Sequence, residues 1–509
     1  MLTRLESSLN LLTGGARDLP TRQQTLRNTV DWSYSLLNGA EQTLFRRLSV
    51  FTGGSTLEAV EAACDTKGDL GLDVLDGMAS LVDKSLVQQV EQVDKETRFF
   101  MLSTIREYAL ERLAESHDEL ATRRAHAAYY LVLAEEGAED IAAQREWLDR
   151  FEVEHDNFRL ALDYLIKTGD AEWGLRLGAA LFRFWETREH LTEGRDAIAR
   201  LLALEGTRTR PKLRARLLFA AAVLAGEQGD YHTARPLFEE SLEICADLND
   251  NRGVAVALNA LAVNARERGE LAAASSLFER CVTIWKNPSD PANVARALSN
   301  LAGVMKLQGK YERASALYEE CLTMFREVRD GAGVAWTLNY MGDVAREKAD
   351  FAAASSFCEQ SLLEFRRLRD SWGIASALSD LASLSCDQGN DAEARRLYVE
   401  SIKVYQEFGH KRGIARALEC LAVSAAGQSN AERSLHLAGA AAALRQRLGA
   451  PLTPTEQPRL EKALEFARRT LGNAAGTAWM EGWAMPVDQA VREALDGVAE
   501  PGPRTRYSV

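Results

Sequence analysis

A short phrase recurs every 40 residues through the second half of the chain, and this period constrains the fold more than any other feature. Its five copies are Gly229-Asp230-Tyr231, Gly269-Glu270-Leu271, Gly309-Lys310-Tyr311, Ala349-Asp350-Phe351 and Gly389-Asn390-Asp391. Five residues after the start of each copy stands an alanine: Ala234, Ala274, Ala314, Ala354 and Ala394. Four residues later comes a large side chain in four copies, at Phe238, Phe278, Tyr318 and Tyr398, and a cysteine in the other, at Cys358. A fixed period of this length predicts a stacked array of helical hairpins, and such arrays bind partners more often than they catalyse reactions.

Apolar residues also recur in register in the first helix of each unit. One position is always leucine, at Leu258, Leu298, Leu338, Leu378 and Leu418, and the position three residues later holds Leu261, Leu301, Met341, Leu381 and Leu421. The next position is always small: Ala262, Ala302, Gly342, Ala382 and Ala422. The i, i+3, i+4 spacing places all three on one helix face, where the small residue lets a partner helix approach closely. Because no unit covers its own apolar face, neighbouring units must cover it, which predicts an α-solenoid.

The first part of the chain has a different pattern. Helical periodicity covers Thr21–Leu37, Gly39–Phe51, Thr56–Cys64 and Leu72–Ser85. Two short apolar runs, 86–90 and 98–102, are typical of β-strands joined by a polar turn, and a further helix is expected over 104–114. Several helices, a hairpin and a helix in this order predict a winged-helix domain.

The predicted fold class is mainly α, a winged-helix domain followed by a tetratricopeptide-type α-solenoid. We expect these segments: 1–20, a residual helix and linker; 21–116, the winged helix; 117–206, a helical connector with a degenerate repeat; 207–446, the repeats; 447–498, a C-terminal helical cap with two helices after 456; and 499–509, a disordered tail.

Composition excludes several classes of function. The net charge of −13 argues against a surface that wraps nucleic acid, which needs concentrated Lys and Arg. The seven cysteines contain no C-x-x-C pair, and Cys281 and Cys321 occupy a recurring small position, so packing explains them better than disulfides or metal. This usage suits a reducing cytosol, and we expect a cytoplasmic protein. No apolar run of about 18 residues occurs, so no membrane span is expected.

The sequence contains no constellation typical of catalysis or metal binding. The seven histidines include no pair at i, i+4 or at another metal-ligand spacing. His155 stands between two acidic residues, but a role in bridging surface helices explains it better than general-base chemistry. Neither G-x-S-x-G nor G-x-x-x-x-G-K-[ST] occurs. We therefore predict no enzyme activity, no catalytic residues, no metal ligands and no cofactors.

The candidate binding surface is the inner face of the array, lined by the first helix of each unit. Arginine, tryptophan and asparagine are enriched at binding surfaces, and several stand at non-core positions of these helices. Arg296, Trp336, Asn339 and Arg346 lie on adjacent units and are the main candidates, followed by Asn259, Arg266, Lys306 and Asp343. A merely solvated groove with Trp336 partly buried is the alternative. The expected partner is a protein, a peptide or a small-molecule inducer.

Direct DNA binding by the winged helix is not expected. Its candidate recognition helix, Leu72–Ser85, carries Asp73, Asp76 and Asp83 but one lysine, Lys84. Phosphate would repel such a helix. A module for intramolecular packing and switching is the better interpretation.

The repeat resembles the tetratricopeptide repeat. The leucine–small pair Leu261-Ala262, the alanine twelve residues on at Ala274 and the aromatic Phe278 stand where that family has them. The longer unit, without a closing proline, is similar to the MalT-like variety.

The front half resembles bacterial STAND regulatory ATPases of the NB-ARC type. The matching segments there are Leu11–Arg17, Arg22–Arg27, Val30–Tyr34, Leu44–Phe51, Leu81–Leu86 and Met101–Ala109. Two further segments, Glu154–Arg159 and Met480–Met485, extend the resemblance nearly to the C-terminus. The resemblance implies a winged helix, a connector and a sensor array in that order, after a nucleotide-binding core that is expected before Leu2 and is missing. Leu102 and Ser103 stand where the family's Met-His-Asp motif has histidine and aspartate, so the family's nucleotide contact is not carried over.

Three functions stay open. The first is the regulatory sensor or scaffold module of a STAND-type signal-transduction protein, which binds a ligand or partner protein on the concave face. The second is a free-standing protein–protein adaptor. The third is a transcriptional regulator that binds DNA through its winged helix. Self-association also stays open.

Overall fold

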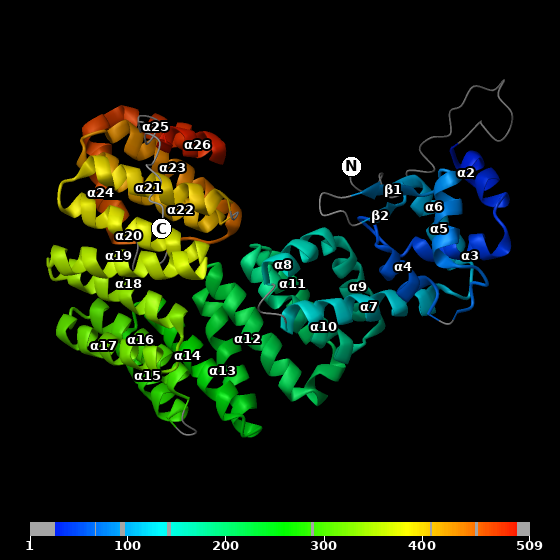
Figure 1. The fold of residues 1–509 in the computed structure, drawn as a ribbon, viewed down its shortest axis with the longest axis horizontal. Coiled ribbons are helices and arrows are strands. Elements are labelled where there is room, and N and C mark those ends of the chain that lie inside the picture. The colour runs from blue at the N-terminus through cyan, green and yellow to red at the C-terminus, as the bar shows by residue number, and fades with distance from the viewer. Residues whose placement is uncertain are drawn as a thin grey trace, which may run out of the picture. The chain divides into compact units, whose positions relative to one another are not determined.

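The computed structural model describes residues 26–66, 68–91, 97–139, 144–286, 290–407, 410–452 and 457–495. The chain divides into two compact units, Met1–Leu217 and Leu218–Val509, which are described separately (Figure 1). The helix predicted within 1–20 and the tail predicted at 499–509 lie outside the described residues. The finer division into segments stays a prediction.

The winged helix has the predicted order of elements. They are α2 (Leu26–Ser35), α3 (Gly39–Leu48), α4 (Leu57–Cys64), α5 (Val74–Asp83), β1 (Gln88–Glu91), β2 (Thr97–Phe100) and α6 (Ser103–Ala114). Polar caps begin three of these helices: Asn38 forms a capping box with Glu41, Thr56 caps α4 and Asp73 caps α5. The strands β1 and β2 pair antiparallel with Gln89 opposite Phe99, and Ser55 forms a bridge to the other edge of β2.

Both strands are displaced from the predicted runs at 86–90 and 98–102. The amides of Leu86 and Val87 donate to the carbonyl of Leu81 at 3.0 and 3.3 Å, so these two residues close the end of α5 instead of starting β1. At the other end, the carbonyl of Leu102 accepts the first hydrogen bond of α6, from Arg106. Residues that apolar alternation assigned to strands therefore form hydrogen bonds at the ends of helices instead.

The connector consists of α7 (Glu119–Glu139), α8 (Gln144–Val153), α9 (His155–Thr168), α10 (Ala171–Thr187), α11 (Leu191–Leu202) and the 3-10 helix η3 (Glu205–Thr209). A buried ion pair between Arg98 of β2 and Glu154, which lies between α8 and α9, joins it to the winged helix. The second carboxylate oxygen of Glu154 accepts from Tyr130 and Asn157, both at 2.8 Å. Asn157 also donates to the carbonyl of Gly54 at 3.0 Å, which adds a second link between the connector and the winged helix.

The array is a run of helical pairs (Figure 1). Its helices are α12 (Pro211–Glu227), α13 (Tyr231–Asp247), α14 (Asn251–Glu267), α15 (Leu271–Trp285), α16 (Pro291–Leu307), α17 (Tyr311–Glu327), α18 (Gly331–Glu347), α19 (Phe351–Leu368), α20 (Ser371–Asp387), α21 (Asp391–Glu407), α22 (Lys411–Gly427) and α23 (Ala431–Leu448). The leucine column is buried throughout, with Leu258 and Leu418 at 0% exposure, and Phe278 and Tyr398 of the aromatic column are also at 0%. The predicted core positions are confirmed.

The three-residue phrase that recurs every 40 residues is the turn inside each hairpin. Gly229, Gly269, Gly309 and Gly389 have φ between 71° and 78°, and Ala349 has the same left-handed conformation at 59°. Glycine adopts this conformation without the strain that a Cβ brings, which explains why four of the five copies carry it.

Cys281 and Cys321 are buried and not in disulfides, as the packing interpretation predicted. Each thiol lies 3.2–3.5 Å from a carbonyl of the preceding helix, at Ala255 and Ala295. Ser361 and Ser401 make the equivalent bond in the next two units. The position therefore accepts a small donor that ties two helices together.

The C-terminal segment differs from the prediction of two helices. It contains α24 (Gln457–Leu471), the 3-10 helix η4 (Gly472–Ala474), α25 (Ala475–Ala484) and α26 (Val487–Leu495). Pro486 separates the last two, because the residue before a proline avoids helical ψ, and Met485 accordingly has ψ 130°. Within the described residues, no helix has the length and apolar character that crossing a membrane requires.

Candidate functional site

The inner face of the array borders a cavity of about 700 Å³. Helices α12, α14 and α16 supply most of its wall, α18 supplies Tyr340 and Asp343, and α22 supplies Arg412 and Arg416. The ring-bearing side chains of the wall are Phe219, Tyr231, Phe238, Tyr318 and Tyr340. Cavities of this size with aromatic walls and a few polar groups are typical of sites for small molecules and short peptides.

The first and last hairpins of the array meet beside this cavity. The guanidinium of Arg412 in α22 forms an ion pair with Glu227 at the end of α12. The adjoining turn packs on the segment after α23, where a Cβ added to Gly229 would lie 2.5 Å from Cγ of Pro451. Residues 185 positions apart therefore close one side of the cavity.

A second cavity of about 420 Å³ adjoins the first. The residues common to both walls are Phe219, Asn259, Ala260, Ser299, Asn300 and Tyr340. Trp336 lies in the wall of the second cavity, where its ring packs 4.8 Å from Phe365 and 5.9 Å from Tyr340, between ring centroids. The two cavities thus share one wall of the inner face.

The structure places six of the eight predicted binding residues in these walls. Asn259, Arg266, Lys306 and Asp343 line the first cavity, and Arg296 and Trp336, again with Asn259, line the second. Asn339 and Arg346 line neither. Asn339 is buried at 3% exposure and donates to Asp380 at 2.7 Å, so it forms a contact between two adjacent repeats of the array. Whether any of the eight binds a ligand stays a prediction.

Charged side chains of the inner face are paired along the array. Lys306 and Arg346 both contact Asp343, and Arg346 reaches Asp387 at 2.7 Å. Burial alone would raise the pKa of the Asp343 carboxyl, but Lys306 and Arg346 outweigh burial and lower that pKa. Arg296 contacts Asp330 at 2.9 Å. A charged group of a ligand would therefore replace one partner of an existing ion pair.

The carboxyl of Asp380 behaves differently. Burial raises its pKa, although Arg416 and the amide of Asn339 oppose this shift. Burial of this carboxyl outweighs the nearby positive charges, so the surroundings of Asp380 solvate its charge poorly.

Tyr340, Arg412 and Arg416 were missed among the candidate residues. Tyr340 stands two residues after the leucine column, in register with Ala260 and Asn300, and these two also line the first cavity. Helical periodicity could have found this column. The residues two before, two after and five after the recurring leucine are spaced i, i+4, i+7, so they lie on one face of the helix. Arg416 stands two residues before the leucine column, as Arg296 and Trp336 do, so the same periodicity marks it as an inner-face position. Arg412 carried no such signal, since only the superhelical path of the array brings it there.

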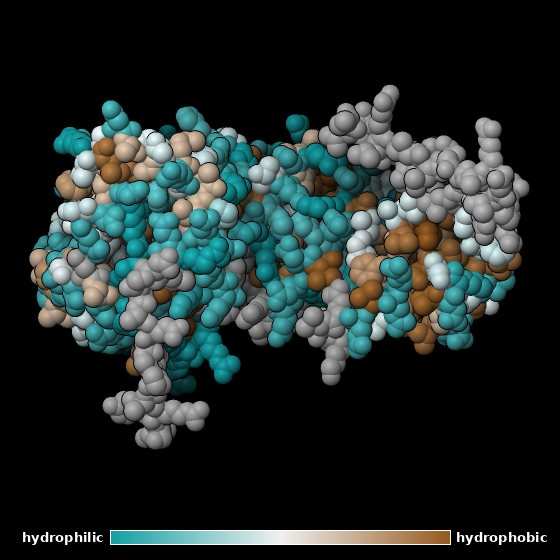
Figure 2. Space-filling model, turned by 90° about the horizontal axis from the view of Figure 1, so that it is seen from above, coloured by the Kyte–Doolittle hydropathy of each residue, from teal (hydrophilic) through white to brown (hydrophobic). Residues whose placement is uncertain are grey.

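In the winged helix, α5 presents little positive charge. Nζ of Lys84 lies 2.7 and 2.8 Å from the carboxylate oxygens of Glu41, and this pair, with Ser80, lowers the pKa of Glu41 to about 2. Figure 2 shows hydrophobic surface on the winged helix. Large exposed apolar side chains of this domain include Trp32, Leu36, Leu75, Val90 and Leu102.

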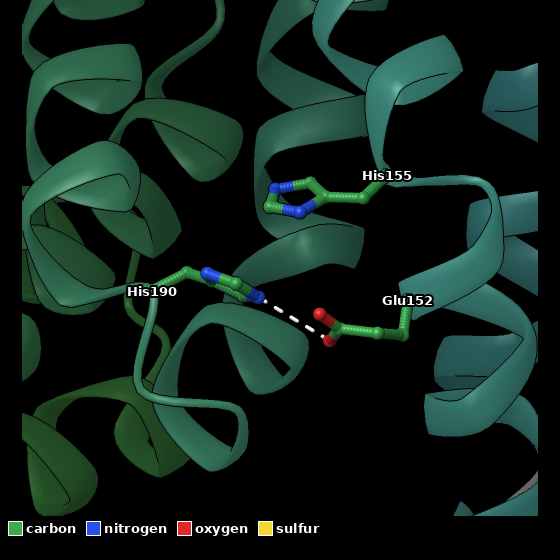
Figure 3. A group of neighbouring side chains, drawn as sticks. All are labelled: Glu152, His155 and His190. Carbon is green, nitrogen blue, oxygen red and sulfur yellow. Dashed lines mark hydrogen bonds and ion pairs between the residues drawn. The ribbon is translucent and has the colours of Figure 1, made fainter. Parts of the chain in front are cut away.

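One cluster of potential metal ligands lies in the connector. Glu152, His155 and His190 each offer a ligand atom, and these atoms lie within 4.8 Å of one another (Figure 3). Glu152 and His155 have a Glu-x-x-His spacing, which a comparison of histidines only with each other does not detect. His190 is 35 residues further on, and only the packing of α11 on α9 brings it close.

Family comparisons agree with this architecture. Residues 37–114 match a winged helix-turn-helix domain. Residues 213–287 and 293–362 match one tetratricopeptide repeat family, and residues 374–407 match another. The chain therefore combines a winged helix with a tetratricopeptide-repeat solenoid, and none of the three matching families is catalytic.

A solved structure shares the fold. It is a Signal Transduction ATPase with Numerous Domains (STAND) protein with a tetratricopeptide repeat sensor, from Pyrococcus horikoshii, with a TM-score of 0.51 and 16% identity over 95% of this chain and 68% of that chain.

Two curated mycobacterial relatives match parts of the chain. "Putative HTH-type transcriptional regulator Rv0890c" from Mycobacterium tuberculosis is 41% identical over 192 residues, which are 37% of this chain and 21% of the relative. "Uncharacterized protein Rv0894" from the same organism is 38% identical over 130 residues, which are 25% of this chain and 33% of the relative. The chain thus spans from a fifth to a third of the length of these relatives.

Proposed function

We propose that this chain is the sensor part of a signal-transduction protein, and that the inner face of its array binds a peptide or a small-molecule inducer. The observation that carries this proposal is the pair of adjoining cavities with aromatic, amide and charged walls. Paired charges of both signs beside aromatic rings suit a ligand with apolar groups and charges of both signs, as a short peptide has.

The winged helix would pass ligand occupancy to a nucleotide switch of the STAND, NB-ARC type. Three observations support this role. The fold neighbour from Pyrococcus horikoshii is described as a STAND protein with a tetratricopeptide repeat sensor. The exposed apolar side chains of the winged helix suit packing against another domain, and the buried Arg98–Glu154 pair couples the winged helix rigidly to the connector. The 509 residues contain no phosphate-binding loop, so we expect this chain alone not to hydrolyse ATP.

A variant that fills the shared wall tests the binding site. Ser299 lines both cavities, so Ser299→Tyr should remove binding of peptides or metabolites that raise the melting temperature of the wild-type chain. Ser356→Tyr places the same ring at an exposed position of α19 and is the matched control. Ligands that bind both variants alike would contradict the site.

The adaptor function gives a different result in the same experiment. A protein partner would be captured by the purified chain while metabolite and peptide pools leave the melting temperature unchanged. Ser299→Tyr should then weaken the capture only if the partner uses the inner face.

Regulation of transcription is the second candidate, favoured by the winged helix-turn-helix match and by the name of the mycobacterial relative. The acidic residues of α5 and the engaged Lys84 favour an indirect role over DNA contact by that helix. Retention on duplex DNA that weakens steeply with salt would support direct binding.

A further inference from the structure

We propose that the connector contains a binding site for one divalent transition-metal ion, such as Zn²⁺, with Glu152, His155 and His190 as ligands. Two imidazoles and a carboxylate are a donor set that such ions prefer, and three protein ligands leave a coordination position open to water. The site is independent of the cavities of the repeat array.

The three ligands come from separate segments that meet at one place. Glu152 lies in the last turn of α8, His155 is the first residue of α9 and His190 precedes α11. Figure 3 shows the three side chains turned toward one another. An ion held there would join three helices of the connector.

The hydrogen bond at Nε2 of His155 leaves Nδ1 available to an ion. Nε2 of His155 lies 2.7 Å from Oε1 of Glu193, which Arg159 also holds. With its proton on Nε2, the neutral imidazole has a lone pair on Nδ1, and a carboxylate in this position is the usual outer partner of a metal-binding histidine. Glu193 would therefore act as a positioning residue.

The second histidine already faces the carboxylate ligand. Nε2 of His190 lies 3.3 Å from Oε2 of Glu152, and the two imidazole centroids are 4.3 Å apart. Phe184 packs against both imidazoles, at 5.0 and 5.2 Å between centroids, and fixes their planes. Two imidazoles this close repel one another when both are charged, whereas a shared ion uses both in the neutral form.

The surroundings suit a site that is ordered yet accessible. The side chain of His155 is 10% exposed, that of His190 26% and that of Glu152 48%, so an ion can enter from the side of Glu152. Glu154, between the two ligands of the α8–α9 junction, is anchored by Arg98. Donor atoms around Zn²⁺ lie roughly 3.4 Å apart, so the ligands need to move by about an ångström, which the half-exposed Glu152 can do.

The test is a titration of the tag-free full chain, stripped with a chelator, with Co²⁺ followed by its visible absorption and then displaced by Zn²⁺. We expect one ion per chain, and a melting temperature that rises with Zn²⁺. Glu152→Gln, an exposed and nearly isosteric change, and His190→Ala should both remove saturable binding and the thermal shift. Glu193→Gln should weaken binding by roughly 10–100-fold.

His232→Ala is the matched control, because His232 is an exposed histidine outside the cluster, and it should bind like the wild type. The proposal is overturned if the wild-type chain shows no saturable absorption at a few-fold excess of Co²⁺. It is equally overturned if the folded Glu152→Gln and His190→Ala proteins bind as the wild type does.

Discussion

At the scale of single residues, the buried polar groups of the first unit decide how the winged helix and the connector fit together. Arg98 and Glu154 are 1% and 3% exposed at their side chains. Arg98 also donates to the carbonyl of Gly54, and Glu154 also accepts from the hydroxyl of Tyr130. A buried charge is tolerated only with a partner, so the two residues depend on each other.

Glu154→Gln should therefore lower the free energy of unfolding by about 3–5 kcal/mol, because it leaves Arg98 buried without its counter-charge. Urea unfolding measures this loss. The half-exposed Arg183–Glu186 pair is the control, since Glu186→Gln should cost at most about 1 kcal/mol. Equal effects of the two substitutions would contradict the importance of burial.

His126 predicts how the stability of this unit depends on pH. It is 3% exposed between Phe51 and Tyr130, and burial lowers its pKa to about 3. In the unfolded chain the pKa is about 6.5, so between pH 6.5 and 3 the unfolded state binds the proton and the native state does not. Stability from this group is therefore lost as the pH falls below 6.5.

Between pH 7 and pH 5 we expect the wild-type chain to lose about 2 kcal/mol through His126. His126→Phe, which keeps an aromatic ring there, should have a flatter dependence over the same range. The measurement is urea unfolding of both proteins at the two pH values. An equal loss of stability between the two pH values in both proteins would show that His126 does not cause the pH dependence.

At the scale of elements, an acidic cap and a glycine define the start of the inner helices. Asp250, Asp330 and Asp370 each accept from the amide of a glycine three residues on, at 2.9 Å. The glycine has no Cβ, which makes room for a side chain of the preceding helix. A Cβ on Gly333 would lie 2.4 Å from Phe325, and one on Gly373 would lie 2.1 Å from Phe365.

Gly373→Ala should destabilise the array by about 1–3 kcal/mol, because the buried ring of Phe365 must move, although alanine favours helix more than glycine does. Gly427→Ala, at an exposed helix end with no atom near the added Cβ, should be neutral or stabilise by up to about 1 kcal/mol. Thermal unfolding distinguishes them, and a stabilised Gly373→Ala protein would refute the packing argument.

The elements show why prediction succeeded in the array and was less accurate elsewhere. The leucine, small and aromatic columns recur because each unit has the same neighbours, so periodicity alone located them. The strands of the winged helix and the three helices after residue 456 have no repeated context. Their limits depend on single events, such as the closing bonds of Leu86 and the break at Pro486.

At the scale of the whole array, the stacking of repeats and the contact between the first and last hairpins contribute separately to stability. Phe278 lies in the continuous core between units and is fully buried, whereas the Glu227–Arg412 pair that joins the first and last hairpins is 30% and 37% exposed. Burial supplies stability, and a partly solvated pair supplies little.

Phe278→Ala should cost about 3–5 kcal/mol, and Glu227→Gln at most about 1 kcal/mol. Glu227→Gln should nevertheless speed hydrogen exchange in the turn 228–230, because that turn loses its link to α22. Denaturant unfolding and hydrogen exchange report the two effects. A large stability loss in Glu227→Gln would show that closure, too, holds the array together.

The sequence by itself determined the class of fold, the hairpin period, the buried columns and the placement of six predicted residues in the cavity walls, because these properties depend on contacts that repeat at fixed spacing. Only the tertiary structure decided that Arg412 faces Glu227, that Arg98 is buried against Glu154, and that His190 lies beside Glu152 and His155. Such pairs depend on how small rotations accumulate over many helices, and no local pattern in the chain records that sum.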